Sequence, residues 1–254
     1  MNQPTVMAVM LTADRHELAP QAVACFLRQT YPNKALLIYD TGEKPLSVEV
    51  GDSICHALAV ERGLPIGALR NNANRLVSAD VIVHWDDDDW SHPNRIAEQV
   101  ALLQTSGAAC VGYNEMLFWR GPHGRATWHE GAQRLVAHDY GEAWLYTNPR
   151  SDYALGTSLC YWRKTWEEKP FRDDLPNENG TGEDYQWIQG MKVCGESGLP
   201  LITRPLNLSG SGREPRMIAR IHGGNSSSQY QNIDLSSSWK RVPEWDARVR
   251  EILG

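Results

Sequence analysis

The segment DVIVHWDDDDW, residues 80–90, joins a short apolar run to four consecutive aspartates. Its first six residues, 80–85, are rich in β-branched side chains, as in a strand that is buried on both faces. Aspartates 86–89 stand where this strand ends, and Trp90 follows them directly, so they do not belong to a floppy charged tail. The segment therefore predicts a buried strand with a group of carboxylates at its carboxyl end.

Two more apolar runs precede this segment. They are residues 5–11 (TVMAVML) and 35–39 (ALLIY), and residues 18–29 between them carry apolar side chains at helical spacing. A strand, a helix and a strand in this order are typical of a parallel sheet with a right-handed crossover. Ligands bind beyond the carboxyl ends of the strands in such open α/β sheets, and Asp40 and aspartates 86–89 stand at such ends.

The rest of the chain gives a mixture of expected elements, and the pattern weakens from about residue 114. Helices are expected over residues 67–79, 93–105 and 183–194, and strands over residues 108–113 and 155–162. A hairpin is expected over residues 115–128, with its turn at 121–124. A short apolar segment follows at residues 217–221, and a surface helix is expected over residues 239–253. The glycine-serine segment 209–212 predicts a flexible connection or a lid.

The composition is that of a globular protein with a sizeable core. The chain has 254 residues, 41% of them hydrophobic, and a formal charge of −6, which excludes collagen-like, coiled-coil and wholly disordered chains. The mild acidity gives no general attraction to nucleic acid or to anionic membranes, so nucleic acid is not an expected partner. No apolar stretch reaches the roughly 18 residues of a transmembrane helix, and the N-terminus lacks the charged start of a signal peptide.

The five cysteines are widely spaced and form no CxxC pair. This usage indicates reduced thiols and neither a zinc site nor a disulfide framework. We therefore expect a cytoplasmic protein, and peripheral attachment at the inner membrane face stays open.

Four adjacent carboxylates need a way to relieve their mutual repulsion. Like charges within about 5 Å raise one another's pKa or attract a cation, and hard oxygen ligands suit Mn²⁺ or Mg²⁺. One or two of the aspartates should face the metal, and the others would bind sugar hydroxyls or support the fold. A solvated acidic turn is the alternative, and the apolar flanks count against it. Mg²⁺ is usually held by few carboxylates together with substrate phosphates, which suggests a diphosphate-containing substrate.

The chain offers no ready-made phosphate loop. It contains neither GxxxxGK[ST] nor GxGxxG after its first strand, which argues against P-loop NTPases and Rossmann dehydrogenases. The metal and a few cations would hold the phosphates instead. Arg15 and Arg70 are candidates because both are expected near strand ends, although each also fits an ordinary surface arginine.

Six segments resemble the inverting family-2 glycosyltransferases with the GT-A fold. In chain order they are FLRQTYPN (26–33), LIYD (37–40), GALRNNANRLVSA (67–79), VHWDDDDW (83–90), GED (182–184) and RIHGGNS (220–226). One such motif alone is weak, but the set follows the family's order from about residue 5 to residue 228.

The resemblance implies an α/β fold of GT-A type. This is a Rossmann-like, open, mixed but mainly parallel sheet flanked by helices, with a C-terminal elaboration. It also implies a single catalytic domain over residues 1–254. Residues 1–113 would bind the nucleotide sugar, and residues 114–254 would bind the acceptor and contribute the C-terminal segment.

The resemblance also implies roles for individual residues. Thr12 and Asp40 would contact the nucleotide, and Arg70 and Asn74 would lie under the nucleotide or diphosphate. Asp86 would support the ribose side of the donor. Asp88 and His222 would be the metal ligands, and Asp184 would be the general base. Together with Arg15, Asp87 and Glu183 these form the full set of candidate residues. The family often has two acidic residues where this chain has Asp40-Thr41-Gly42, so the nucleobase stays open. The run of four aspartates leaves the ligand register open by one position.

The implied reaction is metal-dependent, inverting transfer of a sugar from a nucleoside diphosphate sugar, with a UDP-sugar as the expected donor. The acceptor is a hydroxyl of a glycan, a lipid-linked glycan, a protein or a small molecule. Such chemistry needs a base for the acceptor hydroxyl and stabilisation of the leaving diphosphate. Asp184 suits the first task because apolar neighbours could desolvate it, although Glu183 and Asp184 would also favour a helix N-terminus without any catalytic role.

Two other functions stay open at this point. A nucleotidyltransferase would use a similar sheet and metal, but it would show a glycine-rich loop where this chain has Thr12-Ala13-Asp14-Arg15. A sugar-nucleotide or glycan-binding module without turnover would keep the fold and would be indifferent to loss of Asp184.

Overall fold

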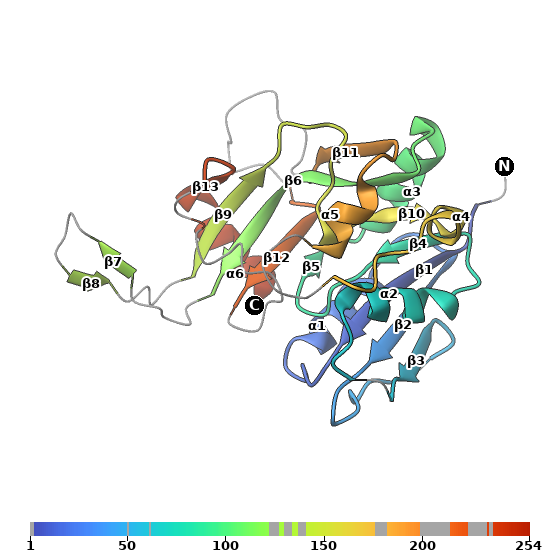
Figure 1. The fold of residues 1–254 in the computed structure, drawn as a ribbon. Coiled ribbons are helices and arrows are strands. Elements are labelled where there is room, and N and C mark those ends of the chain that lie inside the picture. Colours follow the sequence, from blue (N-terminus) through green and yellow to red (C-terminus); the bar gives the residue numbers. More distant parts are fainter. Residues whose placement is uncertain are drawn as a thin grey trace.

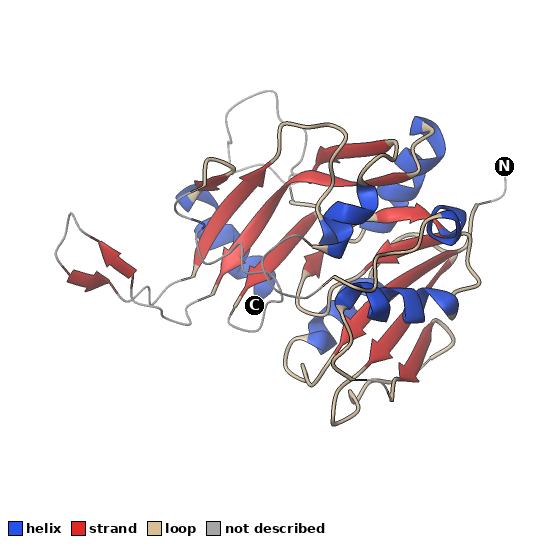
Figure 2. Ribbon diagram, in the orientation of Figure 1, coloured by secondary structure: helices blue, strands red, loops and turns tan. Residues whose placement is uncertain are grey.

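The computed structural model describes residues 3–49, 51–60, 62–121, 127–129, 134–136, 141–175, 182–198, 214–222, 233 and 236–254. The centre of this described part is one large sheet with helices on both of its faces (Figure 1, Figure 2). Within this described part of the chain, no helix has both the length and the apolar character needed to cross a membrane.

Four parallel strands form the N-terminal part of the sheet, in the order β3-β2-β1-β4. They are β1 (Val6–Thr12), β2 (Lys34–Asp40), β3 (Ile54–Leu58) and β4 (Val81–His84). Helix α1 (Ala19–Leu27) connects β1 to β2, which confirms the predicted strand-helix-strand unit. Strand β3 was not predicted, because it lies at the edge of the sheet and most of its side chains are partly exposed.

The remaining strands extend the sheet beyond β4. Strand β10 (Cys160–Trp162) lies antiparallel between β4 and β6 (Cys110–Arg120), and β9 (Glu142–Thr147) and β13 (Trp239–Arg241) continue from β6. Strands β11 (Val193–Ser197) and β12 (Met217–Ile221) run parallel to β6 along its two ends, and β5 (Trp90–Ser91) pairs with β12. The sheet is thus mixed and mainly parallel, as predicted.

Alternate side chains of the central strands pack against different helices. Ala8 and Met10 belong to a hydrophobic cluster with α1, α3 (Arg95–Ser106) and α6 (Asp246–Leu253). Val9 belongs to a second cluster with α2 (Ile66–Arg75), α4 (Arg163–Glu168) and α5 (Glu183–Ile188), which lie on the near side of the sheet in Figure 1. The carboxyl ends of β1 and β4 are therefore held rigidly between two layers of helices.

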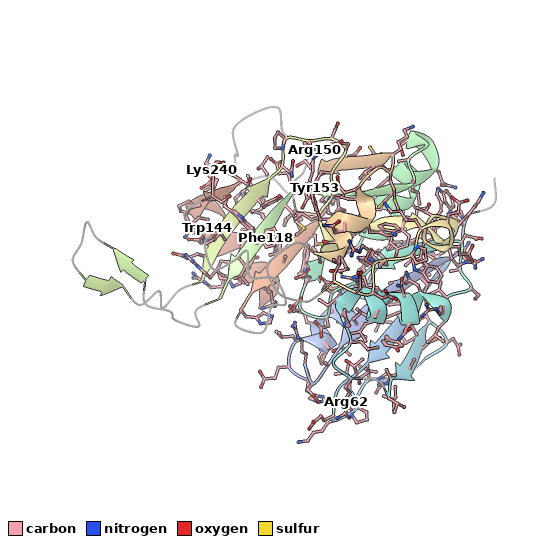
Figure 3. The ribbon with its side chains drawn as sticks, in the orientation of Figure 1. Arg62, Phe118, Trp144, Arg150, Tyr153 and Lys240 are labelled. Atoms are coloured by element: carbon pink, nitrogen blue, oxygen red, sulfur yellow. The ribbon has the colours of Figure 1, made fainter. Side chains whose placement is uncertain are left out.

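The expected hairpin over residues 115–128 is wrong, because β6 pairs with a different partner. Residues Glu115–Arg120 pair with β9, where Phe118 lies opposite Trp144 (Figure 3). The segment β7 (Thr127–His129) instead pairs with β8 (Arg134–Val136) in a separate two-stranded ribbon. Residues 122–124 of the expected turn lie outside the described residues.

Three further elements differ in extent from the prediction. Helix α5 ends at Ile188 rather than at residue 194, since Gly190 adopts a positive φ of 75° and the chain then enters β11. Of the strand expected over 155–162, only β10 forms. The C-terminal helix begins at Asp246, after β13 and Pro243, rather than at residue 239, and it packs against the core through Val249, which is fully buried. The glycine-serine segment 209–212 lies outside the described residues.

Candidate active site

A cavity of about 250 Å³ opens at the carboxyl edge of the sheet. It lies where β1, β4 and β12 end and where α2 passes over the sheet. Its polar lining comes from Thr12, Arg15, Thr41, Arg70, Asp86, Asp87, Asp88, Asp89, Thr157 and Arg220. The edge of the sheet that the sequence predicts as the ligand site is thus where these polar side chains converge.

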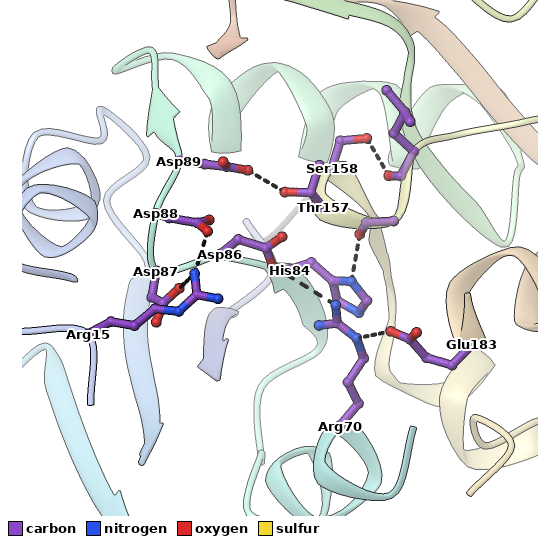
Figure 4. A network of polar contacts seen from close by, with 12 residues as sticks. Arg15, Arg70, His84, Asp86, Asp87, Asp88, Asp89, Thr157, Ser158 and Glu183 are labelled. Atoms are coloured by element: carbon purple, nitrogen blue, oxygen red, sulfur yellow. Dashed lines mark hydrogen bonds and ion pairs between the residues drawn. The ribbon is translucent and has the colours of Figure 1, made fainter. Parts of the chain in front are cut away.

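The four aspartates after β4 do not all point the same way. Carboxylate oxygens of Asp86, Asp88 and Asp89 lie within 4.8 Å of one another (Figure 4). Asp87 turns toward β1 instead, where it accepts a hydrogen bond of 2.7 Å from the hydroxyl of Thr12. The run therefore supplies three clustered carboxylates and one that fastens the loop to β1.

Two arginines and a histidine surround this carboxylate cluster. The Arg15 guanidinium pairs with both Asp87 and Asp88. His222, directly after β12, places Nε2 2.9 Å from Asp88 Oδ2. Arg70 of α2 lies 4.0 Å from Asp86 Oδ1 and donates from Nε to Glu183 Oε1 at 2.7 Å (Figure 4). The predicted residues Arg15, Arg70 and His222 are thus brought to the cluster from three different parts of the chain.

The ionisation of the run differs from position to position. Burial raises the pKa of Asp87 to about 7, against the opposing charge of Arg15. Burial, together with the neighbouring carboxylates, also raises the pKa of Asp89 well above its ordinary value. Burial acts on Asp88 too, but the hydrogen bond from His222 and the charge of Arg15 outweigh it, so the pKa of Asp88 falls below its ordinary value. Asp88 is therefore the member of the run that holds its negative charge most firmly.

The donor atoms of this cluster fit a hard divalent cation. Three carboxylates and an imidazole are a ligand set that Mn²⁺ accepts readily and that Mg²⁺ accepts through its oxygens. Like charges buried this closely repel one another unless a cation lies among them. The chemistry of the residues present thus agrees with a metal held at Asp88.

Glu183 and Asp184 at the start of α5 have different surroundings. Glu183 is engaged by Arg70. Asp184 accepts a hydrogen bond of 2.8 Å from the backbone N–H of Tyr185, and its carboxylate packs against the Cα atom of Gly156. Burial, with a further contribution from Glu183, raises the pKa of Asp184 to about 6. A carboxyl group in this condition exchanges a proton near neutral pH.

Five of the predicted residues do not line the cavity: Glu183, Asp184 and His222, described above, and Asp40 and Asn74, which lie behind it. The carboxylate of Asp40 accepts hydrogen bonds from the backbone N–H groups of Gly42 and Leu46, and His56 Nε2 lies 3.2 Å from it. Asp40 thereby holds the loop that carries Thr41 to the cavity. Asn74 is buried below the cavity and donates to the hydroxyl of Tyr161 at 3.0 Å.

Three residues of the site were given no individual role from the sequence. Thr157 donates a hydrogen bond of 2.6 Å to Asp89, and the backbone N–H of Arg220 donates to the same carboxylate at 3.1 Å. Asp89 and Arg220 belong to segments that resemble the family, so their motifs offered a signal. Thr157 stands in no motif, and only the folded chain brings it to the aspartates.

The model of the glycosyl transferase family 2 matches residues 8–146, more than half of the chain. The chain belongs to glycosyltransferase family 2. The family expected from the sequence is thereby confirmed. No curated protein matches the sequence.

Several solved structures share the fold of this family-2 chain at low sequence identity. A crystal structure of S. aureus TarS 1–349 gives a TM-score of 0.56 at 12% identity, over 85% of this chain and 60% of that chain. The same TarS fragment in complex with UDP-GlcNAc gives 0.58 at 11% identity, over 89% and 61%. The mannosyltransferase PcManGT from Pyrobaculum calidifontis, in complex with GDP-Man and Mn²⁺, gives 0.52 at 14% identity, over 77% and 55%.

These likenesses show a common architecture. The mixed, mainly parallel sheet with its flanking helices matches the GT-A Rossmann-like fold that was predicted. The family-2 chain spans about 60% of the length of the TarS 1–349 structures.

Proposed function

We propose that this chain transfers a sugar from a nucleoside diphosphate sugar, with a UDP-sugar as the first donor to test, to a hydroxyl acceptor in a metal-dependent, inverting reaction. One observation carries the proposal. In a family-2 chain, the clustered carboxylates of Asp86, Asp88 and Asp89 face a cavity that also contains Arg15 and Arg70. Binding of UDP-GlcNAc by TarS, and of GDP-Man and Mn²⁺ by PcManGT, supports a donor of this kind.

The donor residues would divide between the nucleotide and the diphosphate. Thr12 would contact the nucleotide at the end of β1, and Asp40 would act on it indirectly by shaping the loop that bears Thr41. Arg15 and Arg70 would face the diphosphate, because both guanidinium groups already line the cavity beside the carboxylates. Asn74 would support this floor from below through Tyr161.

Asp88 and His222 would hold the metal, and Asp86 would complete the cluster on the ribose side. When bound, Mn²⁺ or Mg²⁺ would supply positive charge that stabilises the leaving diphosphate. The low pKa of Asp88 supports this assignment, because a metal ligand must be ionised. Asp87 is tied to Thr12 and Arg15, so we assign it to the shape of the donor site and not to the metal.

Asp184 would act as the general base. It would take the proton of the acceptor hydroxyl while the acceptor oxygen bonds to the anomeric carbon and the bond from that carbon to the diphosphate breaks. The raised pKa of about 6 supports proton transfer near neutral pH. Glu183 is the less suitable partner because Arg70 already engages it. A single displacement of this kind inverts the anomeric carbon.

The donor assignment is tested by calorimetric titration of UDP, GDP, CDP and dTDP, first with Mn²⁺ and then with EDTA. We expect one nucleotide to bind with Mn²⁺ and to lose at least tenfold in affinity with EDTA or in Asp88→Ala. Asp152→Ala is the matched control, because Asp152 is an exposed aspartate that pairs with Arg150. If none of the four nucleotides binds, or if EDTA has no effect, the proposed donor site is wrong.

The products distinguish the proposed reaction from the two other functions. Release of a nucleoside diphosphate from a sugar donor supports glycosyl transfer, whereas release of pyrophosphate indicates a nucleotidyltransferase. Donor binding without any product, unchanged in Asp184→Asn, indicates a binding module. Acceptors are screened as simple glycosides, lipid-linked glycans and peptides, because each offers a hydroxyl group.

A further inference from the structure

The short turn η1 (Gly156–Ser158) touches both proposed reaction centres. Its second residue, Thr157, donates to Asp89 of the carboxylate cluster at 2.6 Å. Its first residue, Gly156, forms the surface on which the carboxylate of Asp184 rests. Two groups that are 95 residues apart in sequence, Asp89 and Asp184, therefore have their positions set by two consecutive residues.

Gly156 is required for space and not for its backbone conformation. A Cβ atom on Gly156 would lie 1.6 Å from Asp184 Oδ2 and 2.4 Å from Cγ of the same carboxylate. On the other side, a Cβ atom on Gly182 would lie 2.1 Å from Asp184 Oδ1. Neither glycine has a positive φ, so alanine would suit both backbones. The atoms nearest to both added Cβ positions belong to the Asp184 side chain, which lies between the two glycines.

The turn itself is held by buried side chains at every carbonyl. His84 Nδ1 lies 2.7 Å from the carbonyl oxygen of Gly156, and Arg95 donates to that of Thr157 at 3.0 Å. Gln99 donates to the carbonyl of Ser158 at 2.7 Å. Because η1 is fastened at three points to buried groups of β4 and α3, it can serve as a fixed reference for the side chains that rest on it.

The proton on His84 follows from its two partners. A carbonyl oxygen only accepts, so Nδ1 must carry the proton toward Gly156. Burial, with the charge of Arg70, holds the pKa of His84 well below its ordinary value, so the ring is neutral. Nε2 then accepts from the hydroxyl of Tyr161 at 3.2 Å, and that oxygen accepts from Asn74. The chain of hydrogen bonds is satisfied in one orientation only, which fixes Gly156 further.

We propose that η1 aligns the base with the donor, with Gly156 as the positioning residue for Asp184 and Thr157 as the positioning residue for Asp89. This role of η1 rests on the proposed function, because η1 would set the distance between the proposed base and the proposed metal site. Gly156 acts by leaving room for the carboxylate. Thr157 acts by orienting a member of the carboxylate cluster.

The first test is the variant Gly156→Ala, compared with Gly182→Ala and with Gly51→Ala. We expect kcat to fall about 100-fold in the first two, with KM for the donor and the Kd for the nucleotide and Mn²⁺ within twofold of wild type. Gly51→Ala is the control, because nothing lies within 4 Å of a Cβ atom there, and it should keep its activity. If Gly156→Ala keeps kcat within threefold, or if it weakens donor binding as much as kcat, the proposal is overturned.

A double-mutant cycle separates positioning from general damage. If Gly156 acts through Asp184, adding Gly156→Ala to Asp184→Asn should lower kcat by less than threefold more, because the base is already lost. A multiplicative loss in the double variant would assign Gly156 a merely structural role. Should Gly156→Ala fail to fold, Gly182→Ala takes its place in the cycle.

Thr157 is tested by its hydroxyl group. Thr157→Val keeps the shape of the side chain, and we expect it to weaken Mn²⁺ binding five- to tenfold in a titration with the metal alone. Thr157→Ser restores the hydroxyl and should return the affinity to within twofold of wild type. If valine and serine behave alike, the assignment of Thr157 is wrong.

A measurement without substrate keeps this inference separable from the proposed function. The carboxyl carbons of the aspartates are titrated by ¹³C NMR, and Asp184 is identified by the signal that Asp184→Asn loses. We expect that signal to titrate near pH 6 in wild type and nearer the ordinary carboxyl value in Gly156→Ala, since a displaced carboxylate leaves its buried position beside Glu183, Arg70 and Asp86. If wild type turns over no donor, the proposed function fails, and this titration still decides whether Gly156 positions Asp184.

Discussion

The two parts of the chain bring different groups to the proposed site. Residues 1–113, the proposed donor half, contribute aspartates 86–89, Arg15 and Arg70, all of which line the cavity. Residues 114–254, the proposed acceptor half, contribute Thr157 to that lining, and they bring His222 to Asp88 and Glu183, with its neighbour Asp184, to Arg70. The aspartates and Arg15 follow the ends of the neighbouring parallel strands β4 and β1, whereas the second part reaches the site from a turn, a short helix and the end of a paired strand.

The difference suggests a division of labour. Contacts between the halves span long stretches of sequence: 113 residues separate Arg70 from Glu183, and 134 separate Asp88 from His222. Residues 1–113 supply the carboxylate cluster together with Arg15 and Arg70, which pair with it. The second part adds the proposed base Asp184 and groups that contact the cluster. Variants at the cluster should therefore lose binding, whereas variants at Asp184 should lose turnover.

The largest effect is expected at the proposed base. Asp184→Asn should lower kcat by roughly 10³-fold, because the acceptor hydroxyl loses its proton acceptor. The affinity for the nucleotide and Mn²⁺ should stay within threefold of wild type, as measured by calorimetry. Glu183→Gln is the matched control and should lose less than tenfold in kcat. Equal losses of kcat in the two variants would contradict the assignment of Asp184, rather than Glu183, as the base.

The proposed metal ligands should give the next largest effect and sharpen the contrast between loss of binding and loss of turnover. Asp88→Ala should weaken the combined binding of Mn²⁺ and nucleotide about 100-fold, because it removes the firmest negative charge of the cluster. His222→Ala should weaken this binding about tenfold, since an imidazole carries no negative charge to attract the metal. Calorimetry with Mn²⁺ checks both. A larger loss at His222 than at Asp88 would reverse the proposed order.

The pH dependence of turnover should follow Asp184. The base works only when it is ionised, so kcat at saturating donor should fall about tenfold for each pH unit below a pKa of about 6 and level off above it. Donor saturation keeps the aspartate run in its bound state throughout the measurement. In Asp184→Asn the residual rate should lose this acid limb. An unchanged limb in that variant would point to another base.

Arg15 would affect both the binding of the metal and the binding of the diphosphate. Its guanidinium pairs with Asp88, the proposed metal ligand, and therefore competes with a metal. Arg15→Gln should tighten the binding of Mn²⁺ alone about threefold and weaken the binding of nucleotide with Mn²⁺ about fivefold, because the diphosphate loses a cation. Titrations with and without nucleotide measure the two effects. A loss in both titrations would show that Arg15 only supports the fold.

The smallest effect concerns stability. A carboxyl pKa that is raised in the folded state contributes stability below the unfolded pKa of about 4, and this contribution is lost as the pH rises through about 6. Asp184→Asn should therefore gain stability relative to wild type between pH 4 and pH 8, by at most about 3 kcal/mol, or roughly 6–12 °C in Tm. Thermal unfolding at both pH values checks this, and Asp152→Asn should show no such gain.

The sequence predicts the donor half far better than the acceptor half. Strands β1, β2 and β4 are continuous apolar runs, and the helices between them have clear periodicity, so local pattern determines them. Strand β3 lies at an edge, and its partly exposed side chains leave no such run. In the acceptor half, the error over residues 115–128 has another cause. An apolar strand pattern does not say which partner the strand will choose, and β9 competes with the nearer segment.

The site residues, like the strands, could be predicted where a local pattern in the sequence marks them. The aspartates, Asp184 and His222 were identified because each stands in a short motif with a recognisable spacing. The roles of Thr157 and Gly156 were not predicted, because Gly156 meets the carboxylate of Asp184 only in the folded chain, where the carboxylate lies between Gly156 and Gly182. Asp40 was predicted from a local motif to contact the nucleotide, but its side chain is turned toward the backbone of its own loop.

The position of β10 has a consequence for how the chain is made. β10 lies between β4 and β6, so the neighbouring strands of the donor half gain a common partner only when residues 160–162 arrive. Until β10 has been synthesised, the backbone N–H and C=O groups of β4 and β6 that face it would stay unpaired, and unpaired strand edges promote aggregation. A fragment that ends at residue 113 should therefore not fold by itself, and fusions or split versions of this enzyme are better joined after β10 than between the two halves.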